Sequence, residues 1–263
     1  MSQPHTATRS AGLQLAWHTA AAEHPTRART AIIIVGIAIA GAVGFAYDLT
    51  VGRPSRSDLR SIGHMAEATM VYDIANRPVF SFYKEHRIKV PLSRISPHLV
   101  RAIVAVEDRR FFEHRGVDSL RILAAAWTNL LEGRAVQGGS TITQQLARQS
   151  FLTPDKTLRR KLKEAILAAR FEGLYSKEEI LELYLNRVYF GGGLYGAEVA
   201  ARGFFGKPAS RLDVAEAALL AGLVKSPSRY APTVSRERAV ARRNVVLRAM
   251  LADGAIEDRK SVV

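Results

Sequence analysis

The stretches EDRRFFEHRG (residues 107–116) and GGSTITQQLAR (residues 138–148) decide the fold of this chain and indicate its chemistry. An apolar pattern with the period of a helix runs up to the first stretch, which places Glu107, Asp108 and His114 beside several arginines. In the second stretch two glycines precede Thr141, and Gln144 follows three residues later, the spacing of a capping box. The two stretches therefore predict the end of one helix and the start of another.

Each of these helix ends has a structural and a functional interpretation. Arginines at the end of a helix complement its dipole and pair with nearby acidic side chains. Alternatively, Glu107 lies at the mouth of a cleft as a general base. Backbone amides at the start of the second helix, with Arg148 two turns further on, would bind phosphate oxygens. Spacing alone leaves both interpretations open.

A third stretch, LRRKLKEAILAARFE (residues 158–172), predicts a helix with one apolar face. Arg160, Lys161 and Glu164 share the opposite face. They form either a solvated ion pair, worth only about 0.3–0.5 kcal/mol, or a second carboxylate with two cations facing the Glu107 cleft. The pattern by itself favours the solvated pair.

Two further serines have the spacing of helix caps. Ser176 with Glu179, and Ser210 with Asp213, each place an acidic residue three positions after a hydroxyl, and apolar residues follow. We therefore predict helices after both serines, the second over residues 214–223. A mainly α domain follows from this run of helices.

Three segments are interpreted as supporting structure. β-Branched and aromatic residues over 69–83 predict a short β-hairpin. The glycine run at residues 191–193 predicts a flexible loop between helices, suited to a lid or a cleft wall. Residues 215–232 predict a core helix and its exit turn, with a mostly structural role.

Composition limits the classes of partner. The 263 residues suffice for one substantial domain with attachments, and the formal net charge of +14 favours an anionic partner: nucleic acid, an anionic bilayer or a phosphate-bearing substrate. Cysteine is absent, which excludes a disulfide scaffold and cysteine-based metal sites.

One segment is long and apolar enough to cross a membrane. Residues 30–47 carry no charge over 18 positions. A cleaved signal peptide is the alternative, but the apolar run and its polar leader are both longer than usual. We therefore predict a polar cytoplasmic tail over residues 1–29, a transmembrane anchor over 30–47, a stalk over 48–68, a catalytic domain over 69–257 and a non-native tail over 258–263.

Five motifs in order carry a resemblance to a known family. They are EDxxFxxHxG from Glu107, GGSTITQQLA from residue 138, RKxxE from Arg160, NxxYFGxGxYG from Asn186 and AxLAGLxxxPxxYxP over residues 218–232. Together they resemble the family 51 glycosyltransferases, the peptidoglycan polymerases found alone or at the front of class A penicillin-binding proteins. The resemblance covers about residues 69–257.

The resemblance implies a fold, a location and a reaction. The fold is expected to be a lysozyme-like, bilobal α-helical domain, with a head and a membrane-proximal jaw to which residues 120–131 contribute apolar surface. The enzyme is expected in the inner membrane as a single-pass protein with a periplasmic catalytic domain. It would polymerise lipid II into glycan strands by inverting transfer, with undecaprenyl diphosphate as the leaving group.

The resemblance also assigns roles to residues. Glu107 is expected to be the general base and Glu164 the second catalytic carboxylate. The remaining candidates are expected to bind the sugars and the diphosphate; they are Asp108, His114, Ser140, Thr141, Gln144, Gln145, Arg148, Arg160 and Lys161. No cofactor is expected to be required, although a divalent cation, Mg²⁺ or Mn²⁺, would suit the diphosphate.

Expected partners are lipid II, the growing lipid-linked glycan strand, the membrane and other proteins of cell-wall synthesis; nucleic acid is not expected. Two other functions remain open: a lysozyme-like peptidoglycan hydrolase, which would also use two carboxylates, and a non-catalytic membrane-tethered module that binds wall precursors. A further alternative concerns extent, since the chain is either a monofunctional polymerase or the N-terminal part of a bifunctional penicillin-binding protein.

Overall fold

The computed structural model describes residues 25–63, 69–72, 78–82, 88–132, 139–153, 155 and 157–257. Most of the predicted polar tail (residues 1–24), Gly138 and the predicted non-native tail (258–263) lie outside the described residues. The chain divides into two compact units, Met1–Arg53 and Pro54–Val263, which are described separately.

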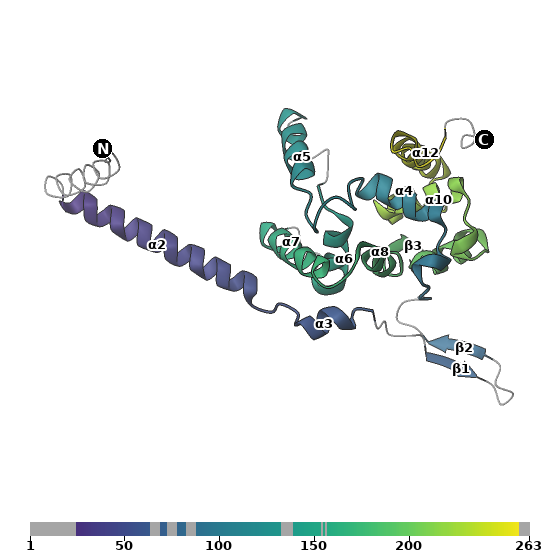
Figure 1. The fold of residues 1–263 in the computed structure, drawn as a ribbon, viewed down its shortest axis with the longest axis horizontal. Helices are drawn as coiled ribbons and strands as arrows, with labels where there is room; N and C mark the ends of the chain where they lie inside the picture. The colour runs from purple at the N-terminus through teal and green to yellow at the C-terminus, as the bar shows by residue number, and fades with distance from the viewer. Residues whose placement is uncertain are drawn as a thin grey trace, which may run out of the picture. The chain divides into compact units, whose positions relative to one another are not determined.

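The described residues of the first unit include one long helix, α2 (Pro25–Thr50), drawn in purple in Figure 1. Its stretch Arg29–Thr50 contains an 18-residue window with a mean hydropathy of 2.2, and none of this window is buried. At 1.5 Å per residue this stretch is about 33 Å long, enough for the hydrocarbon core of a bilayer. The helix includes the whole predicted anchor, although a signal sequence would have the same length and composition.

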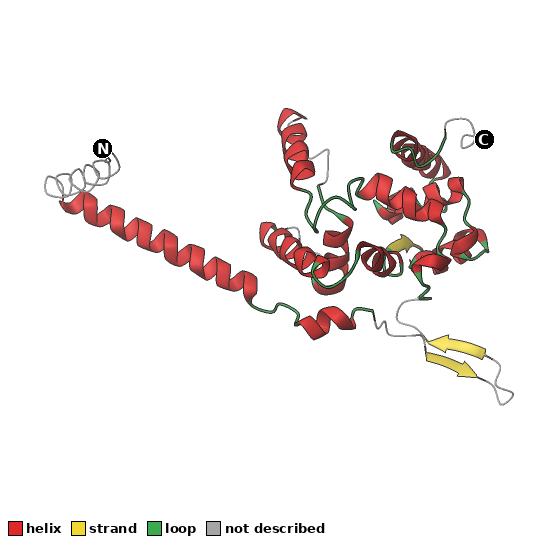
Figure 2. Cartoon of the chain, in the orientation of Figure 1, coloured by secondary structure: helices red, strands yellow, loops and turns green. Residues whose placement is uncertain are grey.

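The second unit is mainly helical, as Figures 1 and 2 show. Its helices are α3 (Arg56–Ser61), α4 (Pro97–Glu107), α5 (Ser119–Glu132), α6 (Ile142–Phe151), α7 (Leu158–Glu172), α8 (Lys177–Leu185), α9 (Ala197–Phe205), α10 (Val214–Val224), α11 (Pro227–Tyr230) and α12 (Arg236–Ala252). Two short 3₁₀ helices are also present: η1 (Leu92–Arg94) precedes α4, and η2 (Ala209–Arg211) lies between α9 and α10.

Two antiparallel hairpins accompany the helices in the part of the chain that the structure describes. Strands β1 (Thr69–Tyr72) and β2 (Pro78–Phe82) pair as predicted for residues 69–83, and the residues that join them lie outside the described part. The glycines 191–193 are the turn of a second hairpin, formed by β3 (Tyr189–Gly191) and β4 (Leu194–Tyr195). The sequence predicted a loop there, but successive positive φ angles of 102°, 60° and 78° make a tight turn that only glycines adopt readily.

The core forms around α10, which packs against α4 and α12, while α6 packs against α7 and α8. Helix α10 is apolar on almost every side, so it is buried on several faces. Helix α12 packs closely against Gly222, which has no side chain; a Cβ atom there would lie 3.1 Å from Cγ of Arg242. This packing fixes where α4 ends and where α12 presents Arg242.

Part of the predicted stalk belongs to the compact unit. Residues 56–61 form α3, whose Leu59 is fully buried, and the hydroxyl of Tyr175 donates to the carbonyl of Leu59 at 2.8 Å. Arg187 also donates to the carbonyl of Ile62 at 2.6 Å. These contacts place α3 in the compact unit that begins at Pro54, while the start of the catalytic domain at residue 69 stays a prediction.

Local capping chemistry explains several helix starts. The predicted capping boxes of Thr141 with Gln144 and of Ser176 with Glu179 are both present. The prediction for Ser210 was wrong, since Asp213 caps α10 with Glu216 as its partner. Ser210 lies instead in η2, whose first residue is held by the carboxylate of Glu198.

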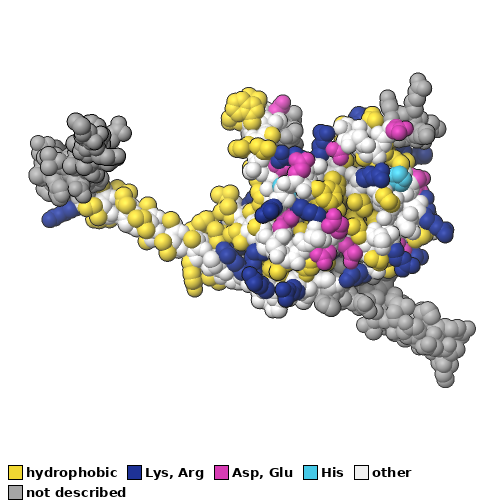
Figure 3. All heavy atoms as spheres, in the orientation of Figure 1, with side chains coloured by type: hydrophobic (Ala, Val, Ile, Leu, Met, Phe, Trp, Pro, Cys, Tyr) yellow, Lys and Arg dark blue, Asp and Glu magenta, His cyan; other side chains and the backbone are white. Residues whose placement is uncertain are grey.

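Helix α5 leaves large apolar side chains exposed. Leu120, Leu123, Trp127, Leu130 and Leu131 are each more than 60% exposed. Figure 3 shows hydrophobic side chains gathered on this helix. An apolar patch of this kind marks a surface that contacts lipid or another protein.

Candidate active site

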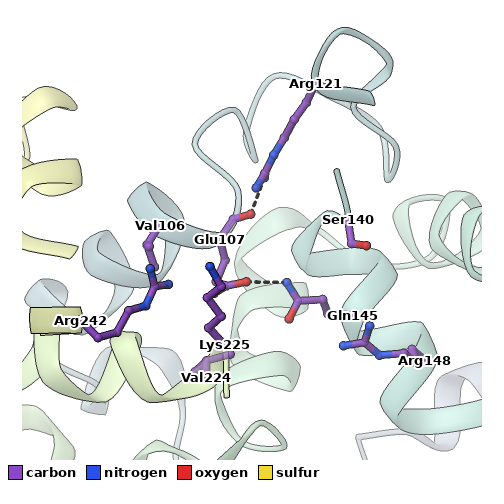
Figure 4. A pocket seen from close by; sticks show the side chains of 9 residues that line it. All are labelled: Val106, Glu107, Arg121, Ser140, Gln145, Arg148, Val224, Lys225 and Arg242. Atoms are coloured by element: carbon purple, nitrogen blue, oxygen red, sulfur yellow. Dashed lines mark hydrogen bonds between the residues drawn. The ribbon is translucent and has the colours of Figure 1, made fainter. Parts of the chain in front are cut away.

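A cavity of about 300 Å³ lies where α4, α6, α10 and α12 meet. Its lining consists of Val106, Glu107, Arg121, Ser140, Gln145, Arg148, Val224, Lys225 and Arg242. Figure 4 shows Glu107 between two walls: Gln145, Arg148 and Ser140 on one side, and Arg242 with Val106 on the other. Among these described lining residues, Glu107 is the single acid and four side chains are basic.

Glu107 is the last residue of α4 and is half-buried. Its Oε2 accepts a hydrogen bond from Nε2 of Gln145 at 2.8 Å, and its backbone carbonyl accepts from the guanidinium of Arg121. Both contacts are drawn in Figure 4. The carboxylate therefore faces the cavity with one oxygen bound and its other oxygen available to a substrate.

Asp108 supports this arrangement from behind. It is completely buried, and its carboxylate lies 3.0 Å from Nε2 of His114 and accepts the backbone N–H of Ile142 at 3.0 Å. A carboxylate at the first amide of a helix is favoured by the helix dipole. Asp108 thus joins the end of α4 to the start of α6, which brings Gln145 to Glu107.

The residues before α6 form the second wall. Thr141 caps α6, and its hydroxyl donates to the carbonyl of Gly116 at 2.6 Å. The side-chain oxygen of Gln144 accepts the N–H of Thr141 at 3.2 Å, and both residues are buried. Their contacts therefore stabilise the start of α6. Ser140 lines the cavity and accepts a hydrogen bond from Nζ of Lys161.

Helix α7 brings only part of its charged face to the cavity. Glu164 is 1% exposed, and it is bound by the guanidinium of Arg160 and by Nζ of Lys161, the latter at 3.0 Å. Lys161 reaches the cavity edge through Ser140. Arg160 and Glu164 do not line the cavity, because each is engaged in this ion triad behind it.

Three cationic lining residues were missed by the sequence analysis: Arg121, Lys225 and Arg242. Arg242 is held by its Nε, 3.4 Å from the carbonyl of Gly222, and by the ring of Tyr230, 5.9 Å from its guanidinium carbon. Lys225 follows α10 directly and is exposed. It is the one charged residue between positions 217 and 228, a signal that was overlooked when this segment was interpreted as structural.

Asp108, His114 and Asp118 also lie close enough to suggest a metal site, with one ligand atom from each within 4.8 Å of the others. The carboxylate of Asp118 is already bound by the guanidinium of Arg110, whose Nε lies 3.0 Å away. This hydrogen bond holds the pKa of Asp118 below its usual range. An arginine occupies the space that a cation would take, so the cluster fits a structural cross-link better than a metal site.

A mainly helical domain whose cavity sets one carboxylate against four cationic side chains is suited to a protein that handles an anionic substrate. Comparison with known families identifies it further. The transglycosylase family matches residues 75–251, more than half of the chain. The chain therefore belongs to the transglycosylase family.

Its relatives are penicillin-binding proteins. The chain is 49% identical over 190 residues to penicillin-binding protein 1A of Escherichia coli (strain K12), covering 72% of the chain and 22% of the relative. It is 48% identical over 190 residues to penicillin-binding protein 1A of Aquifex aeolicus, covering 72% and 26%. For penicillin-binding protein 1F of Bacillus subtilis the identity is 38% over 231 residues, covering 88% and 32%.

The chain thus spans between 22% and 32% of the length of these relatives. Among solved structures, penicillin-binding protein 1A from Haemophilus influenzae aligns with 76% of the chain and 21% of its own length, with a TM-score of 0.42 and 24% identity.

Proposed function

We propose that the chain is a peptidoglycan glycosyltransferase that polymerises lipid II into glycan strands, with Glu107 as its general base. Membership of the transglycosylase family supports the reaction class. The observation that carries the proposal is the cavity itself, in which the Glu107 carboxylate is held by Gln145 among four basic side chains.

The proposed chemistry uses the two sides of the cavity differently. The 4-hydroxyl of an incoming N-acetylglucosamine attacks C1 of the lipid-bound N-acetylmuramic acid, and Glu107 takes the hydroxyl proton. A new O–C1 bond forms as the bond from C1 to the diphosphate oxygen breaks, and that oxygen leaves with the electron pair. Attack from the face opposite the leaving group inverts C1. A positioned base of this kind contributes typically about 10²–10⁴-fold.

The leaving diphosphate carries its own negative charge, so it needs charge neutralisation more than a proton. Arg148, Lys225 and Arg242 line the cavity, and no carboxylate among the described residues forms an ion pair with them. They are therefore available to phosphate oxygens. Lys161 adds a further charge behind Ser140, held in place by Glu164. We assign Glu164 to positioning Lys161 and Arg160, because it is buried beneath them.

The proposed substrate is attached to a lipid, and two helices of the chain, α2 and α5, expose apolar side chains that could contact a bilayer. We propose that α2 anchors the chain in the inner membrane and that the catalytic unit lies on the periplasmic side, where the exposed apolar side chains of α5 contact the bilayer. The growing lipid-linked glycan strand would then remain at the membrane surface while other proteins of cell-wall synthesis act on it.

A protein-held divalent cation does not fit the described residues of the cavity. Mg²⁺ and Mn²⁺ prefer carboxylate and carbonyl oxygens, and the lining offers one carboxylate among four cations. We propose that any Mg²⁺ or Mn²⁺ ion would enter on the diphosphate oxygens of the substrate, where it would neutralise charge on the leaving group.

The competing hydrolase would need a second cavity carboxylate, since glycosidases place two about 5–5.5 Å apart in retaining enzymes, such as lysozyme, and about 6.5–9.5 Å apart in inverting ones. The second candidate, Glu164, is 1% exposed and bound by two cations, which argues against a general acid. The lining favours transfer with a diphosphate leaving group.

The test is Glu107→Gln in the full chain, purified in detergent and incubated with lipid II. We expect glycan polymer from the wild type, loss of at least about 100-fold in rate from the variant, and retained lipid II binding. Glu113→Gln is the matched control, because the Glu113 side chain is 68% exposed on the loop that follows α4 and lies outside the cavity. Muropeptide release from sacculi would support the hydrolase, and an unaffected polymerisation rate in Glu107→Gln would refute the proposed base.

A further inference from the structure

A buried tyrosine completes a chain of hydrogen bonds that ends at Glu107. Tyr184, in α8, is fully buried, and its hydroxyl donates to Oε1 of Gln145 at 3.1 Å. Nε2 of Gln145 in turn donates to Oε2 of Glu107 at 2.8 Å. Tyr184 does not line the cavity, and it belongs to none of the candidate residues that the sequence suggested.

The two ends of the Gln145 amide are chemically opposite. An ionised carboxylate accepts hydrogen bonds and donates none, so it is stabilised by the NH₂ end and repelled by the oxygen end. The shape of the two ends is nearly the same, so packing alone distinguishes them poorly. The hydrogen-bond partner of the other end therefore sets which end faces Glu107.

We propose that Tyr184 is a positioning residue: its hydroxyl holds the oxygen of Gln145, so that the NH₂ group of that amide faces the ionised Glu107 carboxylate. The inference rests on the proposed role of Glu107 as general base. A donor on Oε1 also polarises the amide and strengthens the bond from Nε2, because linked hydrogen bonds reinforce one another.

Tyr184 keeps its proton under working conditions. Burial raises the pKa of its hydroxyl well above the usual range, and the charge of Glu107 raises the pKa further. The hydroxyl therefore stays protonated, and remains a hydrogen-bond donor, at neutral pH. Its ring is anchored in the core, so the donor cannot move away from Gln145 without repacking.

Other charged groups face Glu107 from each neighbouring element. They are Asp108 beside it, Arg121 from α5, Arg148 from α6, Lys161 from α7 through Ser140, Lys225 after α10 and Arg242 from α12. None of them contacts the Tyr184 hydroxyl among the described residues. Removing that hydroxyl leaves all of these charges in place, so a change in pH dependence reports on the amide.

The experiment is Tyr184→Phe in the full chain, with initial rates of lipid II polymerisation measured against pH. Without the hydroxyl, the amide loses the partner that fixes its orientation, and the uncharged form of Glu107 becomes relatively more favourable. We expect the acid limb of the pH–rate profile to move up by roughly one pH unit. The rate would then fall about tenfold on the acid side and recover to within about twofold at high pH.

Two companion variants make the result specific. Tyr175→Phe is the matched control. It removes a hydroxyl that donates to the backbone carbonyl of Leu59 at 2.8 Å, and Tyr175 does not line the cavity. The pH–rate profile of this variant should not shift. In a Gln145→Met background, which has no amide to orient, Tyr184→Phe should produce no further shift. A thermal unfolding curve for each variant identifies a loss that comes from misfolding.

An acid limb that stays in place in Tyr184→Phe, with a rate lowered equally at all pH values, would overturn the inference and leave Tyr184 a core residue. An additional shift in the Gln145→Met background would overturn it as well. Failure of the proposed function is distinguishable, because it would appear in the wild type as absent polymer or in Glu107→Gln as undiminished rate.

Discussion

Gly116 offers a sharp test of how the loop after α4 is held against α7. Its φ angle is +84°, and a Cβ atom added there would lie 2.8 Å from the backbone carbon and 2.9 Å from the carbonyl oxygen of Ala168. Ala168 is completely buried in α7, so neither backbone can easily move. The substitution Gly116→Ala therefore combines two penalties.

Their size follows from the geometry. A residue with a side chain in this left-handed region costs about 1–2 kcal/mol. Carbon atoms approach to about 3.5 Å, so the loop must retreat by more than half an ångström, and overpacking of this kind costs typically about 1–3 kcal/mol. We expect a total loss of about 3 kcal/mol, or about 6–12 °C in the unfolding midpoint of a domain of this size.

Gly192→Ala is the matched control. Its φ is +60°, and no atom lies within 4 Å of the added Cβ, so only the conformational penalty remains. We expect a loss of about 1 kcal/mol, or about 2–4 °C. Both variants would be measured by circular dichroism at one heating rate in the same detergent. Equal midpoints for the two variants would refute the contact between Gly116 and α7.

Two further predictions address charge. Arg110 lowers the folded-state pKa of Asp118 from its ordinary value of 3.8, so this carboxylate contributes stability at neutral pH that is lost as the pH falls through the folded pKa. Between pH 7 and pH 3 the free energy of unfolding, measured with urea, should accordingly fall more in the wild type than in Asp118→Asn. Equal decreases in the two proteins would contradict this prediction. Lys225→Met should lower kcat/KM for lipid II by about tenfold or more without changing the unfolding midpoint, whereas Arg238→Met, exposed outside the cavity, should change neither.

Local chemistry made much of the fold predictable. A hydroxyl and a carboxamide or carboxylate three residues apart satisfy each other's backbone amides, so the starts at Thr141 and Ser176 could be predicted from the sequence. Helix α7 runs over residues 158–172 as its apolar period indicated. The same period correctly placed Arg160, Lys161 and Glu164 on one face, where they form an ion triad.

The predictions that failed depended on tertiary contacts. Ser210 and Asp213 both have an acid three residues later, and the choice between them is made by Glu198, which binds the amide of Ala209 and holds η2 in place. The burial of Glu164 could not be predicted from the sequence either, because it depends on the side chains that pack over this residue in the folded protein. Local pattern does not contain these long-range contacts.

The candidate site was predictable only on one side. Glu107, Ser140, Gln145 and Arg148 line the cavity and stood in motifs with recognisable chemistry. Lys225 and Arg242 line it because α10 packs against both α4 and α12, an arrangement that no motif records. Tyr184 fitted an apolar helix face, so its hydroxyl gave no signal until its contact with Gln145 was seen.

The cavity draws its charged side chains from positions as far apart as 107 and 242. In a chain still emerging from the ribosome, the site is therefore incomplete until α12 has been made. Any fragment that ends upstream of residue 242, through a premature stop or proteolytic cleavage, lacks one cation of the pocket and the helix that packs against α10. The proposed sugar transfer would thereby be confined to molecules in which α12 has been synthesised and has folded onto α10.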